Sequence, residues 1–470
     1  MKSSIYWYDF ETTGTDAARD RAIQFAGVRT DLDLKVVGEP LELLCYPGDD
    51  VIPSPEAMLV TGIRMSALEQ AGLRETDFTG EIHKVLSTPG TCGAGYNSIR
   101  FDDEFTRHLL YRNFFDPYAR EWQGGNSRWD IIDVLRMAQA LRPAGINWPT
   151  NEAGHPVFRL EALTAANNIP HADAHDAAAD VRATVAMARL LKVAQPRLFD
   201  YLFELRNKKA VLAQLYPLGK KPVVHVSSMY SGARQYLAVV LPVCAHPTNS
   251  NGVICYDLSV DPGDLLTIGP EELARRLFTR QSELESDETR IALKTIHVNR
   301  SPAVAPLATL LASDAERLGI DLDLCHRHMR RLQQTSGVTE KIQDAHASAT
   351  FPLTDDPDLM LYQGNFFSNH DRTLMQELRD LPPESLANQR WRFDDARLDE
   401  MVFRFRSRNY PETLSAPERA RWETYRNEIS LGGDRVRETL QRIDALLLEH
   451  PEADCLTDLA AYLHRRWPAA

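Results

Sequence analysis

The sequence lacks several features that would each define a class of protein. None of its six cysteines forms a Cys-x-x-Cys pair, which argues against a structural zinc site and a disulfide framework. No apolar run approaches the ~20 residues that span a bilayer, and the first residues lack the basic-then-apolar order of a signal peptide. We therefore expect a cytoplasmic protein with reduced, buried cysteine thiols.

The chain also lacks an excess of positive charge. Its 53 lysine and arginine residues are outnumbered by 66 aspartate and glutamate residues, and the formal net charge is −13. Nucleic-acid binding depends on clustered lysine and arginine, so such a role requires segregated charge. Basic residues do gather at 326–331 and, interleaved with aromatic residues, at 390–408. Each cluster is also compatible with a solvated helix face.

Length and composition indicate a globular protein with more than one core. Of the 470 residues, 43% are hydrophobic and 25% are charged. These proportions are ordinary for folded domains and exclude collagen-like, coiled-coil and wholly disordered proteins. A single core stops growing well below this length, so we expect two or three domains.

Residues 1–195 alternate between strand-like and helix-like segments. Apolar or alternating runs predict strands at 5–10, 23–30, 41–46 and 91–96. Helical patterns occur at 102–115, 131–141 and 176–193. The first three strands follow one another closely, which favours an antiparallel meander, and the whole segment is typical of an α/β layer architecture.

Two further regions differ from residues 1–195 in their sequence patterns. Residues 196–346 hold short β-rich runs that predict a small barrel or sandwich, with helices at 270–277 and 314–334. Residues 352–470 are helix-compatible, amphipathic and rich in arginine and glutamate, which predicts a helical domain. The predicted domains are therefore 1–195, 196–346 and 352–470.

The first predicted strand carries two acidic residues at its end. Asp9 and Glu11 are separated by one residue, so their side chains project from the same face of the strand. Like charges this close together are unfavourable unless a cation binds between them. Alternatively, the strand ends here and both carboxylates lie in solvent beside the loop that begins at Thr12.

Acidic residues also occur near the start of two predicted helices. Asp102 and Asp103 follow the strand that ends near Asn97, and either acid could serve as a helix cap. Asp180 is an acid among small apolar residues of a late helix, five positions after His175. If His175 precedes that helix, its imidazole can reach the face that presents Asp180. Taken alone, it is a surface histidine.

Together these pieces resemble a known family. An Asp-x-Glu pair on the first strand, an Asn followed by Phe-Asp at a strand-to-helix junction and His-x4-Asp at a late helix are similar to the motifs of the DEDDh family of 3'-to-5' exonucleases. The resemblance implies a ribonuclease H-like fold. It also implies four carboxylate metal ligands, Asp9, Glu11, Asp102 and Asp180. Asp102 takes this role rather than Asp103 because it directly follows Phe101, and His175 is then the general base.

Longer segments resemble the bacterial exodeoxyribonuclease I family. They are residues 9–12, 95–104, 111–114, 126–130, 141–148, 174–176, 195–202, 361–368 and 408–411. This likeness covers nearly the whole chain. It implies a ribonuclease H-like exonuclease domain, an SH3-like β-barrel domain and a C-terminal α-helical domain. The implied activity is 3'-to-5' degradation of single-stranded DNA to 5'-mononucleotides, processively, in DNA repair and recombination.

The implied chemistry is hydrolysis with two metal ions. Carboxylate oxygens suit Mg²⁺, or Mn²⁺ in its place, and two such ions stabilise the attacking and the leaving oxygen. An imidazole can accept the proton of the attacking water near neutral pH.

The substrate contacts are expected at polar and aromatic side chains. Glu11, Thr12 and Asn97 are expected to contact the terminal nucleotide. Bases of a single strand stack on aromatic rings, for which the sequence offers Tyr118, Trp122, Trp129, Trp148 and Tyr201. Each of these rings could equally pack in a core.

The resemblance also implies a protein partner. This partner is the acidic C-terminal tail of single-stranded DNA-binding protein, bound by a basic ridge. Arg142 and Lys221 are cations suited to a terminal carboxylate. Thr339 stands where the ridge would have an arginine, so the chain departs from the family there. The family expectation for the oligomeric state is a monomer.

Two other functions are compatible with the same residues. The core chemistry does not distinguish deoxyribose from ribose, so an RNA-directed DEDDh exonuclease is one alternative. A single-strand-binding protein with a decayed active site is the other. The complete set of acids and histidine argues against decay.

Overall fold

The computed structural model describes residues 3–171, 175–349 and 352–468. Its contacts divide the chain into two compact units, each built from segments that are distant in the sequence. Unit 1 lies within residues 1–127, 172–182 and 353–470, and unit 2 within residues 128–171 and 183–352. Across the described ranges, no helix combines the length and the apolar character that crossing a bilayer requires.

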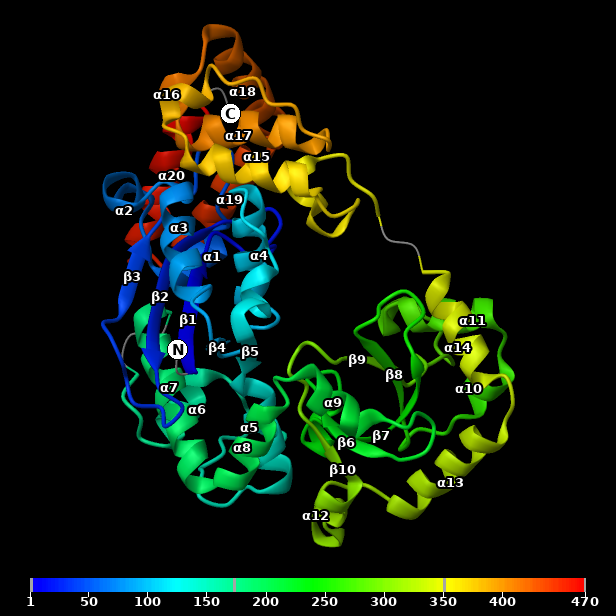
Figure 1. Ribbon diagram of the computed structural model, residues 1–470. Coiled ribbons are helices and arrows are strands. Elements are labelled where there is room, and N and C mark those ends of the chain that lie inside the picture. Colours follow the sequence, from blue (N-terminus) through cyan, green and yellow to red (C-terminus); the bar gives the residue numbers. More distant parts are fainter. Residues whose placement is uncertain (1–2, 172–174, 350–351, 469–470) are drawn as a thin grey trace. The chain divides into compact units, whose positions relative to one another are not determined.

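A five-stranded sheet carries the two acidic residues of the first strand. Its order is β3-β2-β1-β4-β5 (Figure 1), and its strands are β1 (Ser4–Thr12), β2 (Ala22–Thr30), β3 (Leu41–Leu44), β4 (Thr91–Gly95) and β5 (Ser127–Asp130). β1 and β3 both pair antiparallel with β2, whereas β4 runs parallel to β1. The predicted antiparallel meander is therefore confirmed, and β1 lies in the middle of the sheet. The boundary between the units falls within β5.

The two faces of β1 differ in character. Tyr6, Tyr8 and Phe10 pack into a buried cluster with Phe25 of β2 and Phe78 of a helix. Because successive side chains of a strand point to opposite faces, this aromatic side is opposite to the side that carries the acidic residues. The aromatic core therefore fixes which way the acidic residues point.

The helices of unit 1 come from both ends of the chain. The first group is α1 (Pro55–Thr61), α2 (Met65–Ala71), α3 (Glu75–Leu86) and α4 (Asp102–Arg112), with the 3-10 turns Ala119–Glu121 and Gln123–Gly125. The second group is α15 (Asn369–Asp380), α16 (Pro383–Leu386), α17 (Arg397–Asn409), α18 (Ala416–Ile429), α19 (Asp434–Glu449) and α20 (Asp454–Arg466), with the 3-10 turns Pro357–Tyr362 and Pro411–Thr413. α1 and α2 share an apolar core with α19 and α20, and α4 shares one with α15 and α17. The helical C-terminal region is as predicted.

Three arginines of the basic cluster at 390–408 have a different role from either expectation, whereas Arg390 and Arg392 are exposed. Arg404, Arg406 and Arg408 of α17 are buried. Arg408 lies 2.8 Å from Asp50, and Arg404 lies 3.2 Å from Asp358, which also bonds to Arg408. These three arginines therefore form neither a solvated helix face nor a free phosphate track. We call the buried ion pairs among Arg21, Asp50, Glu75, Arg112, Asp358, Arg404 and Arg408 the arginine network.

Unit 2 contains a second five-stranded sheet. Its order is β10-β6-β7-β8-β9, all antiparallel, and its strands are β6 (Val223–Val226), β7 (Leu237–Ala245), β8 (Gly252–Asp257), β9 (Leu293–His297) and β10 (Val304–Pro306). The small β domain predicted here is confirmed. β10 was not predicted, since it has only three residues.

The remaining helices lie in unit 2, wholly or, for α7, in part. They are α5 (Ile131–Leu141), α6 (Leu160–Ala166), α7 (Ala177–Ala194), α8 (Pro196–Glu204), α9 (Lys208–Leu215), α10 (Gly263–Thr267), α11 (Pro270–Phe278), α12 (Ala312–Arg317), α13 (Leu322–Gln334) and α14 (Val338–Ala347), with 3-10 turns at Gly232–Arg234, Gln281–Glu283 and Leu307–Thr309. α7 begins in unit 1 and continues in unit 2. The single helix predicted at 314–334 is wrong, because the chain turns at Gly319, whose φ of 64° ends α12.

Candidate active site

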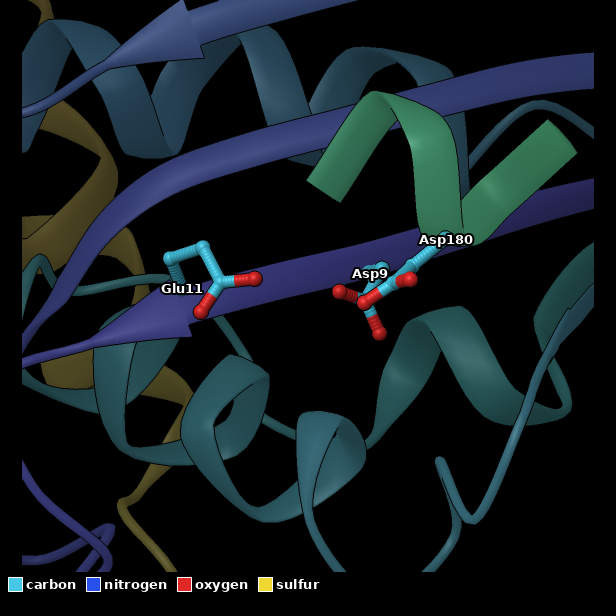
Figure 2. Close-up of side chains that lie close together, drawn as sticks. All are labelled: Asp9, Glu11 and Asp180. Carbon is cyan, nitrogen blue, oxygen red and sulfur yellow. The ribbon is translucent and has the colours of Figure 1, made fainter. Parts of the chain in front are cut away.

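Three carboxylates meet at the end of β1. One ligand oxygen each from Asp9, Glu11 and Asp180 lies within 4.8 Å of the other two. Figure 2 shows the carboxylates of Asp9 and Asp180 beside each other, with that of Glu11 farther along β1. Asp9 and Glu11 come from β1, and Asp180 comes from the first turn of α7. We call these three residues the acid cluster.

Asp102 lies beside the acid cluster but is not one of its three members. It is the first residue of α4 and is buried, with 2% of its surface exposed. Its Oδ1 accepts a hydrogen bond of 3.0 Å from the backbone N–H of Phe10. The main chain next to Asp9 therefore holds Asp102 close to the cluster.

The electrostatics of the acid cluster favour a bound cation. Burial raises the pKa of Asp9 well above its usual value, and the charges of Asp102 and Asp180 raise it further. Burial, together with the charges of Asp9 and Asp180, raises the pKa of Glu11 to about 9. A divalent cation among these oxygens would offset the repulsion and favour the charged forms. The donor set consists of hard carboxylate oxygens, which fits Mg²⁺ or Mn²⁺.

His175 lies immediately before the helix that carries Asp180. α7 begins at Ala177, so the two side chains do not belong to one regular helix. His175 is exposed and has a φ of 68°. Asp176 follows it, and its Oδ2 accepts a hydrogen bond of 3.1 Å from the N–H of Ala179. Residues 172–174 lie outside the described residues.

The structure also distinguishes the surroundings of Asp103 from those of Asp102, which sequence spacing alone could not do. Asp103 is buried and accepts hydrogen bonds from the hydroxyl of Tyr8 and from the guanidinium of Arg120. Its carboxylate is therefore paired within the protein, although Asp103 directly follows Asp102 on α4 and its partner Tyr8 directly precedes Asp9 on β1. Arg120, in a short 3-10 turn, gave no signal in the sequence that would have connected it to this site.

Of the residues expected at the terminal nucleotide, Glu11 belongs to the acid cluster and Thr12 directly follows it. Thr12 is buried at the end of β1, and its hydroxyl donates a hydrogen bond of 2.7 Å to the carbonyl of Gly14. Asn97 follows β4 and has a φ of 60°. This left-handed conformation is uncommon for a residue other than glycine.

The candidate stacking residues differ in their surroundings. Tyr118 and Trp122 line a cavity of about 480 Å³ in unit 1 together with Phe366, and Trp122 is 67% exposed. The ring of Tyr201 is half-buried, and its hydroxyl donates to the carbonyl of Val304 at 2.9 Å. Trp129 is buried against Phe199 and Phe203 and is a core residue. Trp148 is partly buried and donates to a backbone carbonyl.

The two residues predicted at the partner site lie in unit 2 and differ in their surroundings. Arg142 donates a hydrogen bond of 3.2 Å to the carbonyl of Thr309 and lies 3.7 Å from the carboxylate of Asp314. Lys221 is exposed just before β6. Of the two, Arg142 already has an acidic neighbour.

Three family models match the chain. The model described as Exonuclease matches residues 6–188, the Exonuclease I SH3-like domain matches residues 206–348, and the Exonuclease I C-terminal domain matches residues 355–466. The first match contains most of β1 and the whole acid cluster. The fold and the site thus define an exonuclease with a ribonuclease H-like domain, followed by an SH3-like and a helical domain, as the resemblance implied.

Comparison with individual relatives identifies the family within this class of exonuclease. Exodeoxyribonuclease I of Escherichia coli is 44% identical over 91% of this chain and 90% of its own length. The solved structure of exonuclease I from Methylocaldum szegediense has 51% sequence identity to this chain and a TM-score of 0.93, with 99% of both chains covered. The zinc-bound complex of Escherichia coli exonuclease I with single-stranded DNA is 41% identical, with a TM-score of 0.95 and coverage of 99% and 100%. The chain belongs to the exodeoxyribonuclease I family.

Proposed function

We propose that the chain hydrolyses single-stranded DNA from its 3' end and releases 5'-mononucleotides, in DNA repair and recombination. The acid cluster at the end of β1 carries this proposal, because it lies within the segment that matches the Exonuclease model. The substrate class is supported by the relatives named exodeoxyribonuclease I and by the solved complex with single-stranded DNA.

The proposed cofactor is Mg²⁺, as two ions that Mn²⁺ can replace. Asp9, Glu11, Asp102 and Asp180 would hold it, and the zinc-bound relative supports binding of a divalent cation. When bound, the ions stabilise the charge that develops on the phosphate and on the attacking and leaving oxygens.

His175 is proposed as the general base. It takes a proton from the attacking water while the water oxygen bonds to phosphorus. The bond between phosphorus and the 3' oxygen then breaks, and that oxygen leaves with the electron pair and takes up a proton from solvent. Because His175 is exposed, its acquired proton can return to water between turnovers.

Single-strand selectivity is proposed to arise from base stacking on Tyr118, Trp122 and Tyr201. The cavity that both Tyr118 and Trp122 line supports this role for the first two rings. The terminal nucleotide is proposed to contact Glu11, Thr12 and Asn97. Processive action is proposed as well, and release of the strand after every cut in a trap-challenge assay would contradict it.

The decisive experiment uses a 5'-labelled single-stranded DNA, its RNA counterpart and a blunt duplex, with and without Mg²⁺. We expect metal-dependent shortening of the single-stranded DNA from its 3' end, and loss of this activity in Asp180→Ala. Equal cleavage of RNA would favour an RNA-directed enzyme. Binding of single strands without any cleavage would indicate a binding protein instead.

A second experiment tests the stacking residues. Trp122→Ala should weaken binding of single-stranded DNA about 5- to 150-fold, because one stacked base contributes about 1–3 kcal/mol. Phe278→Ala in α11 removes another exposed ring and should leave the affinity unchanged. Fluorescence anisotropy measures both, and equal affinities would remove Trp122 from the substrate contacts.

The partner is proposed to be the acidic C-terminal tail of single-stranded DNA-binding protein, held by Arg142 and Lys221. Anisotropy with a labelled tail peptide should show weaker binding to Arg142→Ala than to wild type, and Arg327→Ala serves as a control on α13. Equal binding of the peptide by Arg142→Ala and by wild type would count against the site.

The domain boundaries at 195–196 and 346–352, the monomeric state and the cytoplasmic location stay predictions.

A further inference from the structure

We propose that Gln24 is a positioning residue that holds the start of α7 against the sheet and thereby sets the places of His175 and Asp180. The inference rests on the proposed roles of those two residues in catalysis. Gln24 belongs to none of the motifs described above.

The position of Gln24 follows from the pairing of β1 and β2. In the antiparallel register, Gln24 lies directly opposite Glu11. Side chains of residues that are directly opposite project from the same face of the sheet. Gln24 is therefore on the face of β2 that adjoins the acid cluster, and it is partly buried there.

The amide of Gln24 makes two contacts to the start of α7. Its Nε2 donates a hydrogen bond of 3.0 Å to Oδ1 of Asp176, and its Oε1 accepts one of 3.4 Å from the N–H of Ala177. These partners are a carboxylate, which accepts, and a backbone N–H, which donates. An amide offers one group of each kind, whereas a carboxylate lacks the donor and an ammonium lacks the acceptor.

Asp176 transmits this constraint to both functional residues. Its Oδ2 caps the helix through the N–H of Ala179, and its carbonyl accepts from the N–H of Asp180 at 3.0 Å. His175 comes just before Asp176 in a left-handed conformation, which persists in a non-glycine residue only when its surroundings hold it there. Gln24 thus ties the helix start to the strand that pairs with β1.

The test compares Gln24→Ala and Gln24→Glu with wild type and with the control Gln195→Ala. Gln195 follows the other end of α7, where its Nε2 donates to the carbonyl of Ala144 at 2.8 Å. We expect Gln24→Ala to lower kcat for single-stranded DNA about 10- to 100-fold, since small misplacements of reacting groups have effects of this order. KM should change less than threefold. Gln24→Glu should lower kcat at least as much, because it places a carboxylate against Asp176.

A second measurement does not depend on activity. Hydrogen exchange followed by mass spectrometry should show faster exchange in residues 175–182 of Gln24→Ala, with no change there in Gln195→Ala. Unchanged exchange in Gln24→Ala would overturn the proposal, as would a kcat within twofold of wild type or equal losses in Gln24→Ala and Gln195→Ala. Faster exchange together with an inactive wild-type protein would support the positioning and remove the proposed function.

Discussion

Unit 1 holds two clusters of buried carboxylates that behave in opposite ways. In the acid cluster, burial and neighbouring carboxylates raise the pKa values of Asp9 and Glu11. In the arginine network, burial also raises the pKa values of Asp50, Glu75 and Asp358, but adjacent guanidinium groups bring all three below their usual values.

The difference shows that the partner, rather than burial, decides how a buried carboxylate titrates. The arginine network supplies its cations from the chain and connects α17 to the N-terminal part of unit 1. The charges that raise the pKa values of Asp9 and Glu11 are those of neighbouring carboxylates, and a bound cation would compensate them. One cluster serves stability, and the other is suited to binding metal.

Asp9→Asn gives the largest expected effect. Removing this charge should lower turnover of single-stranded DNA about 1,000-fold, because a metal site supplies several kcal/mol of transition-state stabilisation. In EDTA, the urea midpoint should stay the same or rise, since like-charge repulsion is relieved. Mg²⁺ should raise the midpoint of wild type but not that of the variant. A lower midpoint in EDTA would contradict the comparison.

Asp358→Asn should have the opposite effect on stability. It removes the buried carboxylate that Arg404 and Arg408 share. Breaking a buried pair costs up to about 3–5 kcal/mol, and the loss should lie toward the lower end because Arg408 keeps Asp50 and Arg404 keeps Asp356. The urea midpoint should fall clearly, whereas turnover of the folded enzyme at 25 °C should stay within a few-fold of wild type. Asp399 is an exposed acid on α17, the helix that carries Arg404 and Arg408. Asp399→Asn is therefore the control and should leave the midpoint unchanged.

Lowering the pH should weaken the arginine network and reduce the stability of the fold. The pKa of Asp358 is lower in the folded protein than in an unfolded chain, so its stabilisation is present above the unfolded value of about 4 and is lost as the pH falls further. One such carboxylate contributes on the order of 2–3 kcal/mol. Wild type should lose stability between about pH 5 and pH 2 more steeply than Asp358→Asn. Parallel curves would show that Asp358 does not titrate as described.

Glu56→Gln gives the smallest expected effect. Glu56 pairs with Arg442 at 2.5 Å, but both side chains are about half exposed. Exposed pairs contribute only about 0–1 kcal/mol and are screened by salt. The urea midpoint should shift little, and less still at high ionic strength. A shift as large as that of Asp358→Asn would show that burial does not separate the two kinds of pair.

Much of the fold was predictable from local patterns. The strands β1 to β4, the helices α4, α5 and α7 and the small second sheet all follow from apolar periodicity over segments of useful length. α1 and α2 were not predicted because each has only seven residues. Their buried side chains pack against residues of α19 and α20, which are nearly 400 positions away.

The candidate site likewise contains residues that the sequence predicted and residues that it did not. The spacing of Asp9 and Glu11 predicted their shared face, and the family resemblance supplied Asp180. The roles of Gln24 and Asp103 depend on single contacts between distant segments, such as the bond between Gln24 and Asp176 across 152 positions. Likewise, the arginines of α17 were grouped by sequence as a basic cluster, because their acidic partners lie elsewhere in the chain.

The bond between Asp50 and Arg408 also has a consequence for synthesis. The two residues are 358 positions apart, and translation proceeds at about 5–20 residues per second. Asp50 therefore leaves the ribosome roughly 20–70 s before Arg408, with Arg21 as the partner that is already synthesised. During this interval the N-terminal part of unit 1 lacks the last members of its ion network and the helices that cover it. The fold of the nuclease core is completed only when the C-terminal segment emerges.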